Sequence, residues 1–314
     1  MNKKNILGVG ITDASEKEVL EYIIKNLENF TEKSYFVTPN PEFLVLANKN
    51  ITFKNILNNA DLALADGVGV MIAAKILGKP LRDRFTGVDL VKNLCEVVSE
   101  KPITVGFLGG RGGVAELTAE CLRKKYPKLK VGFVGEEWPN EKLSDSTHSL
   151  KDSSKPSGNT SLIHEDGSHP TAENFYQKSL GDSVKNSFRE EYRQSDRLPR
   201  HKLTVKYASQ KVSCSDHTPS AMRHLPIDIL FVAYGAPKQE FWISKNLPKI
   251  PVKIAIGVGG AFDYISGKIP RAPGFLRNFG LEWLFRLIVQ PWRIKRQLSL
   301  FEFIYLVLKE RMSQ

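Results

Sequence analysis

Histidine is absent from most of this sequence. All six histidines lie between residues 148 and 224, so the rest of the chain has none to act as a general base. A base elsewhere must therefore be Asp, Glu, Lys, Tyr or Cys. Because the histidines are irregularly spaced and have no carboxylate or cysteine partner at a fixed offset, we expect no metal site.

Cysteine and long apolar runs are also scarce. Cys95, Cys121 and Cys214 form no CxxC pair, which indicates reduced thiols rather than a disulfide framework or a zinc site. No window reaches the roughly 18 apolar residues of a spanning helix, and the N-terminal apolar run is too short for a signal peptide. We therefore expect a cytoplasmic protein. Its net charge of +11 predicts an anionic partner, such as nucleic acid, a phosphorylated substrate or lipid headgroups.

Short apolar runs alternate with stretches of helical period along the chain. Helical patterns such as 16–30 and 87–100 lie between the runs, and this alternation predicts an α/β fold with a parallel, doubly wound sheet. The 314 residues, 41% of them hydrophobic, are enough for a full core. The predicted strands are 5–11, 34–40, 61–67, 103–110, 129–135, 228–235 and 252–260.

Two regions depart from this alternation. Residues 142–224 are rich in Ser, Lys, Asp and His with few apolar clusters, which predicts a disordered insertion. From Leu281 the chain is helix-like, aromatic and basic. We therefore expect a catalytic domain over 1–280, interrupted by the insertion, and a helical appendage over 281–314. Pro291 should break or kink the appendage helix at Gln290.

Polar residues follow two of the predicted strands. Asp66 ends the run "ADLALADG", and α/β proteins place reactive groups at the carboxyl ends of parallel strands. Asp66 is therefore a candidate base, although an Asp before Gly is also a common turn residue or helix N-cap. Thr38 and Asn40 end another strand, where Asn40 taken alone is typical of an N-cap before Pro41.

Two more predicted strands end in glycine. The stretch "FLGGRGGVAE" surrounds Arg111 with four glycines and then begins a helix, which suits a diphosphate, although a tight turn is the plain alternative. It is not the G-x-G-x-x-G dinucleotide fingerprint. The stretch "VAYGAPKQE" places Lys238 and Gln239 in the first helical turn after Gly235, which indicates ligand contact. Four such strand ends favour a binding cleft.

The motifs "TPNPEF", "ADGVGV", "RFTGVDL", "FLGGRGGVAE", "VAYGAPKQE", "GVGGAFDYISGKIPRAP" and "LEWLFRLIVQPWR" together resemble the TagA/WecG/CpsF family of glycosyltransferases, glycosyltransferase family 26. The resemblance covers roughly residues 5–138 and 226–305, and no family counterpart is recognised for the polar insertion. It implies a Rossmann-like fold with a C-terminal helical appendage. It also implies transfer of N-acetylmannosamine, or a related sugar, from a UDP donor to polyprenyl-diphosphate-linked N-acetylglucosamine, as in synthesis of the teichoic acid linkage unit.

The resemblance also implies roles for particular residues. Asp66 corresponds to the base that deprotonates the acceptor hydroxyl in a single inverting displacement, and Thr38 and Asn40 lie near the acceptor. The remaining catalytic residues that it implies are Arg84, Gln239, Arg286, Arg293 and Arg296. The expected nucleotide-side residues are Gly109, Gly110, Gly113, Gly235, Lys238 and Asp263, although Asp263 fits a structural turn equally well.

The expected partners are the UDP-sugar donor, the lipid-linked acceptor and an anionic membrane surface, with neither cofactor nor nucleic acid. The protein would lie on the inner face of the cell membrane, its appendage contacting lipid and covering the active site, or else forming a core or dimer face. Whether it is a homo-oligomer stays open. The alternatives are a UDP-N-acetylmannosaminuronic acid transferase and a nucleotide-dependent oxidoreductase, which the missing G-x-G-x-x-G disfavours.

Overall fold

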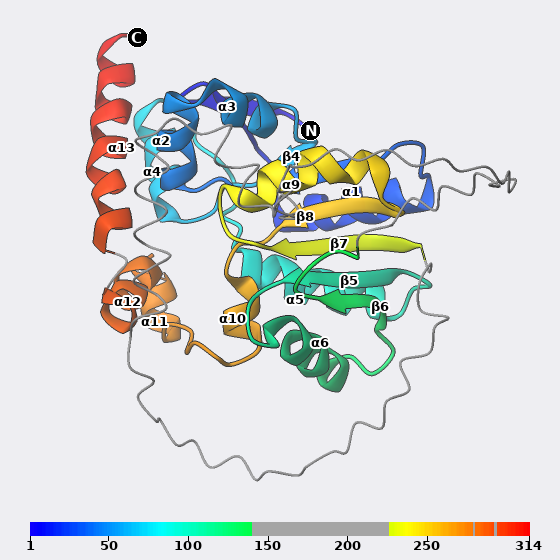
Figure 1. Ribbon diagram of the computed structural model, residues 1–314. Coiled ribbons are helices and arrows are strands. Elements are labelled where there is room, and N and C mark those ends of the chain that lie inside the picture. Colours follow the sequence, from blue (N-terminus) through cyan, green and yellow to red (C-terminus); the bar gives the residue numbers. More distant parts are fainter. Residues whose placement is uncertain (140–225, 279, 292–293) are drawn as a thin grey trace, which may run out of the picture. The chain divides into compact units, whose positions relative to one another are not determined.

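The centre of the fold is a six-stranded sheet in the order β4-β3-β8-β7-β5-β6, with all neighbouring strands parallel (Figure 1). The computed structural model describes residues 1–139, 226–278, 280–291 and 294–314, so the predicted insertion at 142–224 lies outside the described residues. The strands are β3 (Ser34–Val37), β4 (Leu62–Ala63), β5 (Thr104–Gly109), β6 (Lys130–Gly135), β7 (Ile227–Ala233) and β8 (Val252–Gly257). The predicted α/β class with a parallel sheet is confirmed.

The N-terminal run differs from its prediction. Residues 5–11 are not one strand of the sheet but belong to an antiparallel hairpin of β1 (Lys3–Ile6) and β2 (Val9–Thr12). Leu7 and Gly8 make the turn with φ values of 51° and 79°, the positive pair that a tight hairpin turn requires. The hairpin is joined to the main sheet where Thr12 Oγ1 accepts the N–H of Ala63 at 3.0 Å.

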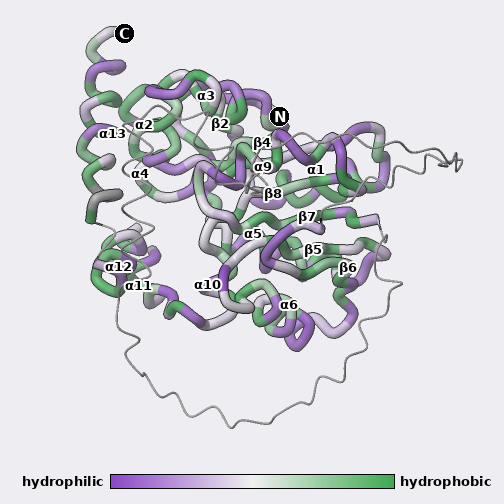
Figure 2. The backbone as a smooth tube through the Cα atoms, in the orientation of Figure 1, coloured by the Kyte–Doolittle hydropathy of each residue, from purple (hydrophilic) through white to green (hydrophobic). Residues whose placement is uncertain are grey.

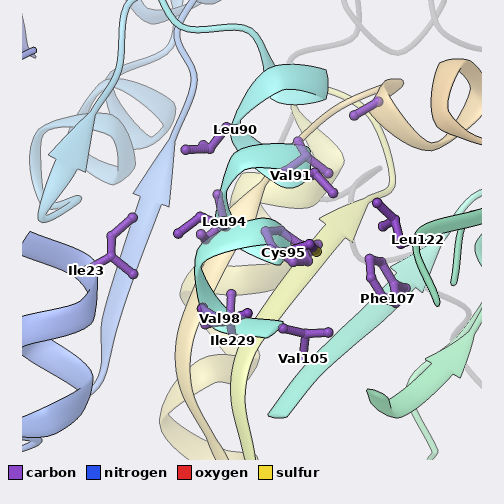
Figure 3. Close-up of a cluster of buried hydrophobic side chains, with 14 of the residues drawn as sticks. Ile23, Leu90, Val91, Leu94, Cys95, Val98, Val105, Phe107, Leu122 and Ile229 are labelled. Atoms are coloured by element: carbon purple, nitrogen blue, oxygen red, sulfur yellow. The ribbon is translucent and has the colours of Figure 1, made fainter. Parts of the chain in front are cut away.

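Helices cover both faces of the sheet. On one face, α5 (Gly87–Ser99) presents Leu94, Cys95 and Val98 to the strands, and Phe107 of β5 packs among them (Figure 3). The other helices of this face are α1 (Glu16–Glu28), α6 (Val114–Lys125) and α10 (Ala261–Ile265). The opposite face is covered by α2 (Pro41–Lys49), α3 (Ile51–Asn58) and α9 (Lys238–Asn246), followed by the short η2 (Leu247–Lys249).

The C-terminal helices extend beyond the sheet. After α11 (Gly274–Asn278), α12 (Glu282–Val289) ends with Gln290 as its C-cap, and α13 (Ile294–Met312) begins after Pro291, so the predicted helix break is confirmed. α13 lies beside α2 and α4 (Val68–Ile76), where it buries Phe303 and Val307 (Figure 1). Apolar and polar residues alternate along α13 (Figure 2). Over the described residues, no helix combines the length and the apolar character needed to cross a membrane.

Candidate active site

Asp66 lies at the carboxyl edge of the sheet, directly after β4. Its N–H donates to the carbonyl of Pro39 at 2.8 Å, which continues the parallel pairing of β4 with β3 past the ends of both strands. On the other side, the N–H of Phe85 donates to the carbonyl of Ala65 at 2.8 Å, and Asp66 and Phe85 form a parallel bridge. The backbone of Asp66 is therefore fixed from both sides.

The carboxyl group of Asp66 does not cap the helix that follows. The N-cap of α4 is Gly67, which has a φ of 87° and no side-chain cap. The interpretation of Asp66 as an N-cap is therefore wrong, because Gly67 in this left-handed conformation separates the carboxylate from the first turn.

Charged groups from distant segments surround the half-buried Asp66. Burial raises its pKa, as do the carboxylates of Glu282 and Asp89, whereas Arg84 and Arg286 lower it, and the net effect is a pKa of about 7. An aspartate with this pKa changes protonation near neutral pH, which suits a general base. The like charge with the larger effect on Asp66, Glu282, comes from the first turn of α12.

An arginine links two of these carboxylates. Arg271 holds Asp89 through two bonds of 2.6 and 2.7 Å, and its Nε lies 3.4 Å from an oxygen of Glu282. Burial would raise the pKa of Asp89, but the hydrogen bonds from Arg271 and Thr86 outweigh it and hold the pKa below its ordinary value. Arg271 therefore ties the start of α12 to the start of α5.

Arg84 approaches the same place from the loop before α5. Its Nη1 and Nη2 donate to the main-chain carbonyl of Arg277 in α11 at 3.4 and 3.5 Å. The Nε of Arg277 is buried and has no hydrogen-bond partner among the described residues. Arg84, which acts on the charge of Asp66, therefore also connects the loop before α5 to α11.

Arg286 brings α12 to the end of β8. Its guanidinium lies 5.2 Å from the centre of the Tyr264 ring, and its Nη2 is 2.7 Å from the position that a Cβ on Gly260 would occupy. Oδ2 of Asp263 lies 3.5 Å from that same position. Arg293 and the side chain of Arg296 lie outside the described residues, so the structure places only the first of the three predicted appendage arginines.

Thr38 and Asn40 bond within the protein. Thr38 is buried, and its Oγ1 donates to the carbonyl of Gly257 at 3.1 Å. Asn40 is the N-cap of α2, its Oδ1 accepting the N–H of Phe43 at 3.1 Å, as the interpretation from the sequence alone favoured. Both residues lie at the same edge of the sheet as Asp66, since all three follow neighbouring parallel strands.

Gln239 is also buried, with 1% of its surface exposed. Its Oε1 accepts the N–H of Gly259 at 2.9 Å, and its Nε2 donates to Glu240 at 2.7 Å. The side chain therefore joins α9 to the segment after β8 instead of projecting into solvent. Lys238, which precedes it, is half-buried at the start of α9, and Gly235 has a φ of 77° just after β7.

The glycine-rich loop before α6 already uses some of its N–H groups. Gly110 donates to the carbonyl of Ala233 at 3.3 Å, and Gly113 donates to the carboxylate of Glu136 at 3.0 Å. At Gly109 (φ 103°) a Cβ would lie 2.9 Å from the backbone of Ala233, so the glycine permits the close approach of β5 and β7. A phosphate at Gly113 would have to replace the Glu136 carboxylate.

Four charged residues of this site were not predicted: Asp89, Arg271, Arg277 and Glu282. Asp89 and Arg271 lie within the quoted motifs "RFTGVDL" and "GVGGAFDYISGKIPRAP", and Glu282 lies in "LEWLF". Three of the four residues therefore lie in motifs that could have marked them as site residues. Their pairing joins residues 182 positions apart, which spacing alone does not reveal.

Comparison with known proteins identifies relatives along most of the chain. A model of the "Glycosyl transferase WecG/TagA/CpsF family" matches residues 4–149 and 183–314. Three relatives carry the name N-acetylglucosaminyldiphosphoundecaprenol N-acetyl-beta-D-mannosaminyltransferase. The Bacillus spizizenii protein is 27% identical over 100% of this chain and 94% of its own. The Bacillus subtilis protein is 23% identical over the same shares, and a Staphylococcus aureus protein is 24% identical over 98% and 93%.

Between residues 4 and 314 the family match leaves out residues 150–182, a shorter stretch than the 142–224 expected to lack a counterpart. It spans both the strand ends that surround Asp66 and the appendage that supplies Glu282 and Arg286. The chain therefore belongs to the WecG/TagA/CpsF family of glycosyl transferases.

Proposed function

We propose that this protein transfers N-acetylmannosamine from a UDP donor to a polyprenyl-diphosphate-linked N-acetylglucosamine, with inversion at the transferred carbon and Asp66 as the base. The names of the relatives supply the acceptor and the β-linked sugar. A β-linked product from an α-linked nucleotide sugar requires inversion, which a single displacement achieves.

The observation that carries the proposal is the setting of Asp66. Its backbone is fixed, its carboxyl group caps no helix, and its pKa of about 7 leaves a substantial basic fraction at neutral pH. In the reaction, the carboxylate accepts the proton of the acceptor hydroxyl while the new glycosidic bond forms and the bond to UDP breaks. Such a base typically contributes on the order of 10² to 10⁴ in rate.

The arginines near Asp66 suit a reaction in which the donor and the acceptor each carry a diphosphate. Arg84 and Arg286 act on the Asp66 charge, and Arg277 has a buried Nε without a partner among the described residues. Guanidinium groups bind phosphate oxygens as paired donors, and they stabilise the charge that develops on a departing UDP. We therefore assign these arginines to the diphosphates of donor and acceptor, and we expect catalysis without a metal.

The appendage supports a lipid-linked acceptor. α13 presents an exposed apolar stripe whose members recur every three or four positions and are between 50% and 88% exposed. These residues are Ile294, Leu298, Phe301, Tyr305, Leu308 and Met312. Residues 268–314 contain nine Lys or Arg and three Asp or Glu, so the region is cationic. An apolar stripe in a cationic region suits the surface of an anionic bilayer.

One aromatic residue of α13 does not fit the lipid contact expected of the appendage. Phe303 is 3% exposed and packs toward α2 and α4, so it anchors α13 to the catalytic domain and cannot face a membrane. Two ion pairs reinforce this attachment, Lys49 with Glu302 at 2.6 Å and Lys79 with Glu310 at 3.6 Å. α13 thus has one face on the protein and another that is exposed.

The test is a transfer assay with a short-chain polyprenyl-diphosphate-linked N-acetylglucosamine. UDP-N-acetylmannosamine and UDP-N-acetylmannosaminuronic acid are compared as donors, with and without EDTA, and the product is analysed by mass spectrometry and by the anomeric NMR signal. We expect a β-linked N-acetylmannosamine product that forms equally well in EDTA. Transfer of the uronic acid alone would support the alternative donor, and an α-linked product would contradict the inverting mechanism.

A further inference from the structure

The segment from Gly257 to Gly260, which follows β8, is a meeting point of the site. The carbonyl of Gly257 accepts the hydroxyl of Thr38. A Cβ on Gly87, the first residue of α5, would lie 2.6 Å from the carbonyl oxygen of Val258. Arg286 lies against Gly260. Segments that carry predicted substrate contacts therefore meet at these four residues.

Two adjacent side chains of α9, Gln239 and Glu240, contact this segment. Gln239 accepts the N–H of Gly259 and donates to Oε1 of Glu240, and the two residues are 1% and 0% exposed. A Cβ on Gly257 would lie 2.9 Å from the Gln239 amide nitrogen and 3.1 Å from Oε1 of Glu240. The glycine thus lets the backbone approach the pair closely.

We propose that Glu240 is a positioning residue for the transfer reaction, which acts through Gln239 to hold the Gly257–Gly260 segment in place. Gln239 could present its amide in either of two orientations, and only one puts Oε1 toward the N–H of Gly259. The acceptor oxygen of Glu240 selects that orientation by binding Nε2. The effect of Glu240 on sugar transfer rests on the proposed function, whereas its effect on the Gly257–Gly260 segment does not.

The surroundings of Glu240 keep its carboxyl group neutral. Burial raises its pKa to about 8, and the hydrogen bonds from Gln239 and from its own N–H only partly oppose this. The titratable side chains of the elements packed on α9 are Lys54, Tyr35, Lys249, Asp228 and Lys253. None of them contributes to the pKa of Glu240, and Lys253 is instead paired with Asp228 at 2.7 Å.

The second oxygen of Glu240, Oε2, is buried and has no hydrogen-bond partner in the described part of the chain. An ionised carboxylate there would be a buried charge without a cation, which is costly. The neutral acid avoids that charge and still offers Oε1 to Gln239. Ionisation as the pH rises through about 8 should therefore strain the pair and loosen the segment that it holds.

The first experiment compares Glu240→Gln and Glu240→Leu in the full chain by amide hydrogen exchange over residues 257–261. Glutamine retains an acceptor oxygen for Gln239, so exchange should match the parent. Leucine has a similar size but no acceptor, so the N–H of Gly259 should exchange on the order of 10-fold faster. Parent-like exchange in Glu240→Leu would overturn the proposal, as would Glu240→Gln behaving like Glu240→Leu.

A second measurement keeps the proposal testable even if Glu240→Leu does not fold. The raised pKa means that the contribution of neutral Glu240 to stability is full below its ordinary value near 4.5 and is lost as pH rises through about 8. The melting temperature of Glu240→Gln should therefore increasingly exceed that of the parent over this range. A constant difference across the range would contradict a neutral Glu240.

Asp228→Asn is the matched control. Asp228 accepts the N–H of Thr104 at 2.7 Å at the start of β7, the opposite end of the sheet from the site. It should lower stability without changing exchange at residues 257–261 or the turnover number. In the transfer assay, Glu240→Leu should lower kcat more than it raises KM, and Glu240→Gln should restore kcat. If the parent protein transfers no sugar while the exchange results hold, the proposed function fails and the positioning role of Glu240 stands.

Discussion

Asp66 and Glu240 are two carboxylic acids with raised pKa values, yet their surroundings differ. Asp66 is half-buried and faces Glu282, Arg84, Arg286 and Asp89, all from other segments of the chain. Glu240 is fully buried, and no charged side chain of the described residues contributes to its pKa. The pKa of a carboxyl group among opposing charges changes when those charges change, whereas the pKa of one in an apolar interior is set mainly by its burial.

This difference separates a group suited to chemistry from one suited to structure. The pKa of Asp66 balances burial and like charges against two arginines, so a substrate diphosphate that engages those arginines would change it further. The pKa of Glu240 is raised chiefly by burial and opposed by two hydrogen bonds, with no charged group among its causes, so it should be insensitive to substrate. A raised pKa is therefore informative only together with its cause.

The largest expected effect is that of Asp66→Asn. The amide keeps the shape but cannot accept a proton, and no histidine lies outside residues 148–224 to replace it. Turnover should fall on the order of 10² to 10⁴. In the parent, kcat/KM should fall about tenfold per pH unit below pH 7, because protonated Asp66 is inactive. Steady-state kinetics across pH 5 to 9 provide the measurement.

The stability of Asp66→Asn provides a control with a defined sign. Because folding raises the pKa of Asp66 to about 7, its contribution to stability is full below the ordinary value and is lost as pH rises through 7. The variant should therefore melt at the same temperature as the parent, or higher, at pH 8. A lower melting temperature together with lost turnover would indicate misfolding instead of a missing base.

Arg286→Ala should have the next largest effect, on the order of 100-fold in kcat, if its guanidinium stabilises the departing diphosphate. The control is Arg82→Ala, which removes an exposed arginine paired with Asp13 and Glu18. Arg82→Ala should leave kcat unchanged. An Arg286→Ala variant that raises KM for the donor at unchanged kcat would assign Arg286 to ground-state binding.

Much of this arrangement could be predicted from the sequence, but not its long-range pairings. The apolar run before Asp66 placed it at a strand end, and Pro291 marked the break between α12 and α13. The hydrogen bond between Gln239 and Gly259 was not predicted, because the two residues are 20 positions apart and only the parallel pairing of β7 with β8 brings them together. The hairpin at Leu7 was missed because a leucine with positive φ is rare.

A smaller effect should follow from removing part of the exposed stripe of α13. Phe301→Ser with Tyr305→Ser removes two aromatic rings that are 73% and 62% exposed, so the fold should be unaffected. Binding to anionic liposomes should weaken on the order of 10-fold or more, with unchanged turnover on a soluble acceptor. Phe303→Ser, on the buried face, should instead lower the melting temperature. Liposome binding unchanged by the double substitution would exclude this stripe as the lipid contact.

Glu282→Gln tests the charge balance at Asp66 directly. Removing this carboxylate should lower the pKa of Asp66, so the acid limb of the rate profile should move to lower pH and turnover at pH 6 should rise a few-fold. Glu302→Gln is the control, since Glu302 belongs to the same appendage but pairs with Lys49. A profile that moves equally in both variants would indicate a general effect of appendage charge instead of a contact with Asp66.

The smallest expected effect is that of shortening the polar segment. The experiment compares two predictions of how much of this segment is dispensable, one from composition and one from the family match. Composition alone predicts that residues 142–224 are dispensable, because polar sequence cannot offset an ordering cost of roughly 1 to 2 kcal/mol per residue. Within this segment, however, the family model leaves only residues 150–182 unmatched. A chain that joins Ser149 to Ser183 should therefore keep turnover within about twofold of the parent. A chain that joins Glu141 to Leu225 through a short Gly/Ser linker decides between the argument from composition and the argument from the family match. Equal activity would support composition, and loss of UDP binding in the longer deletion alone would assign part of 183–224 to the donor site.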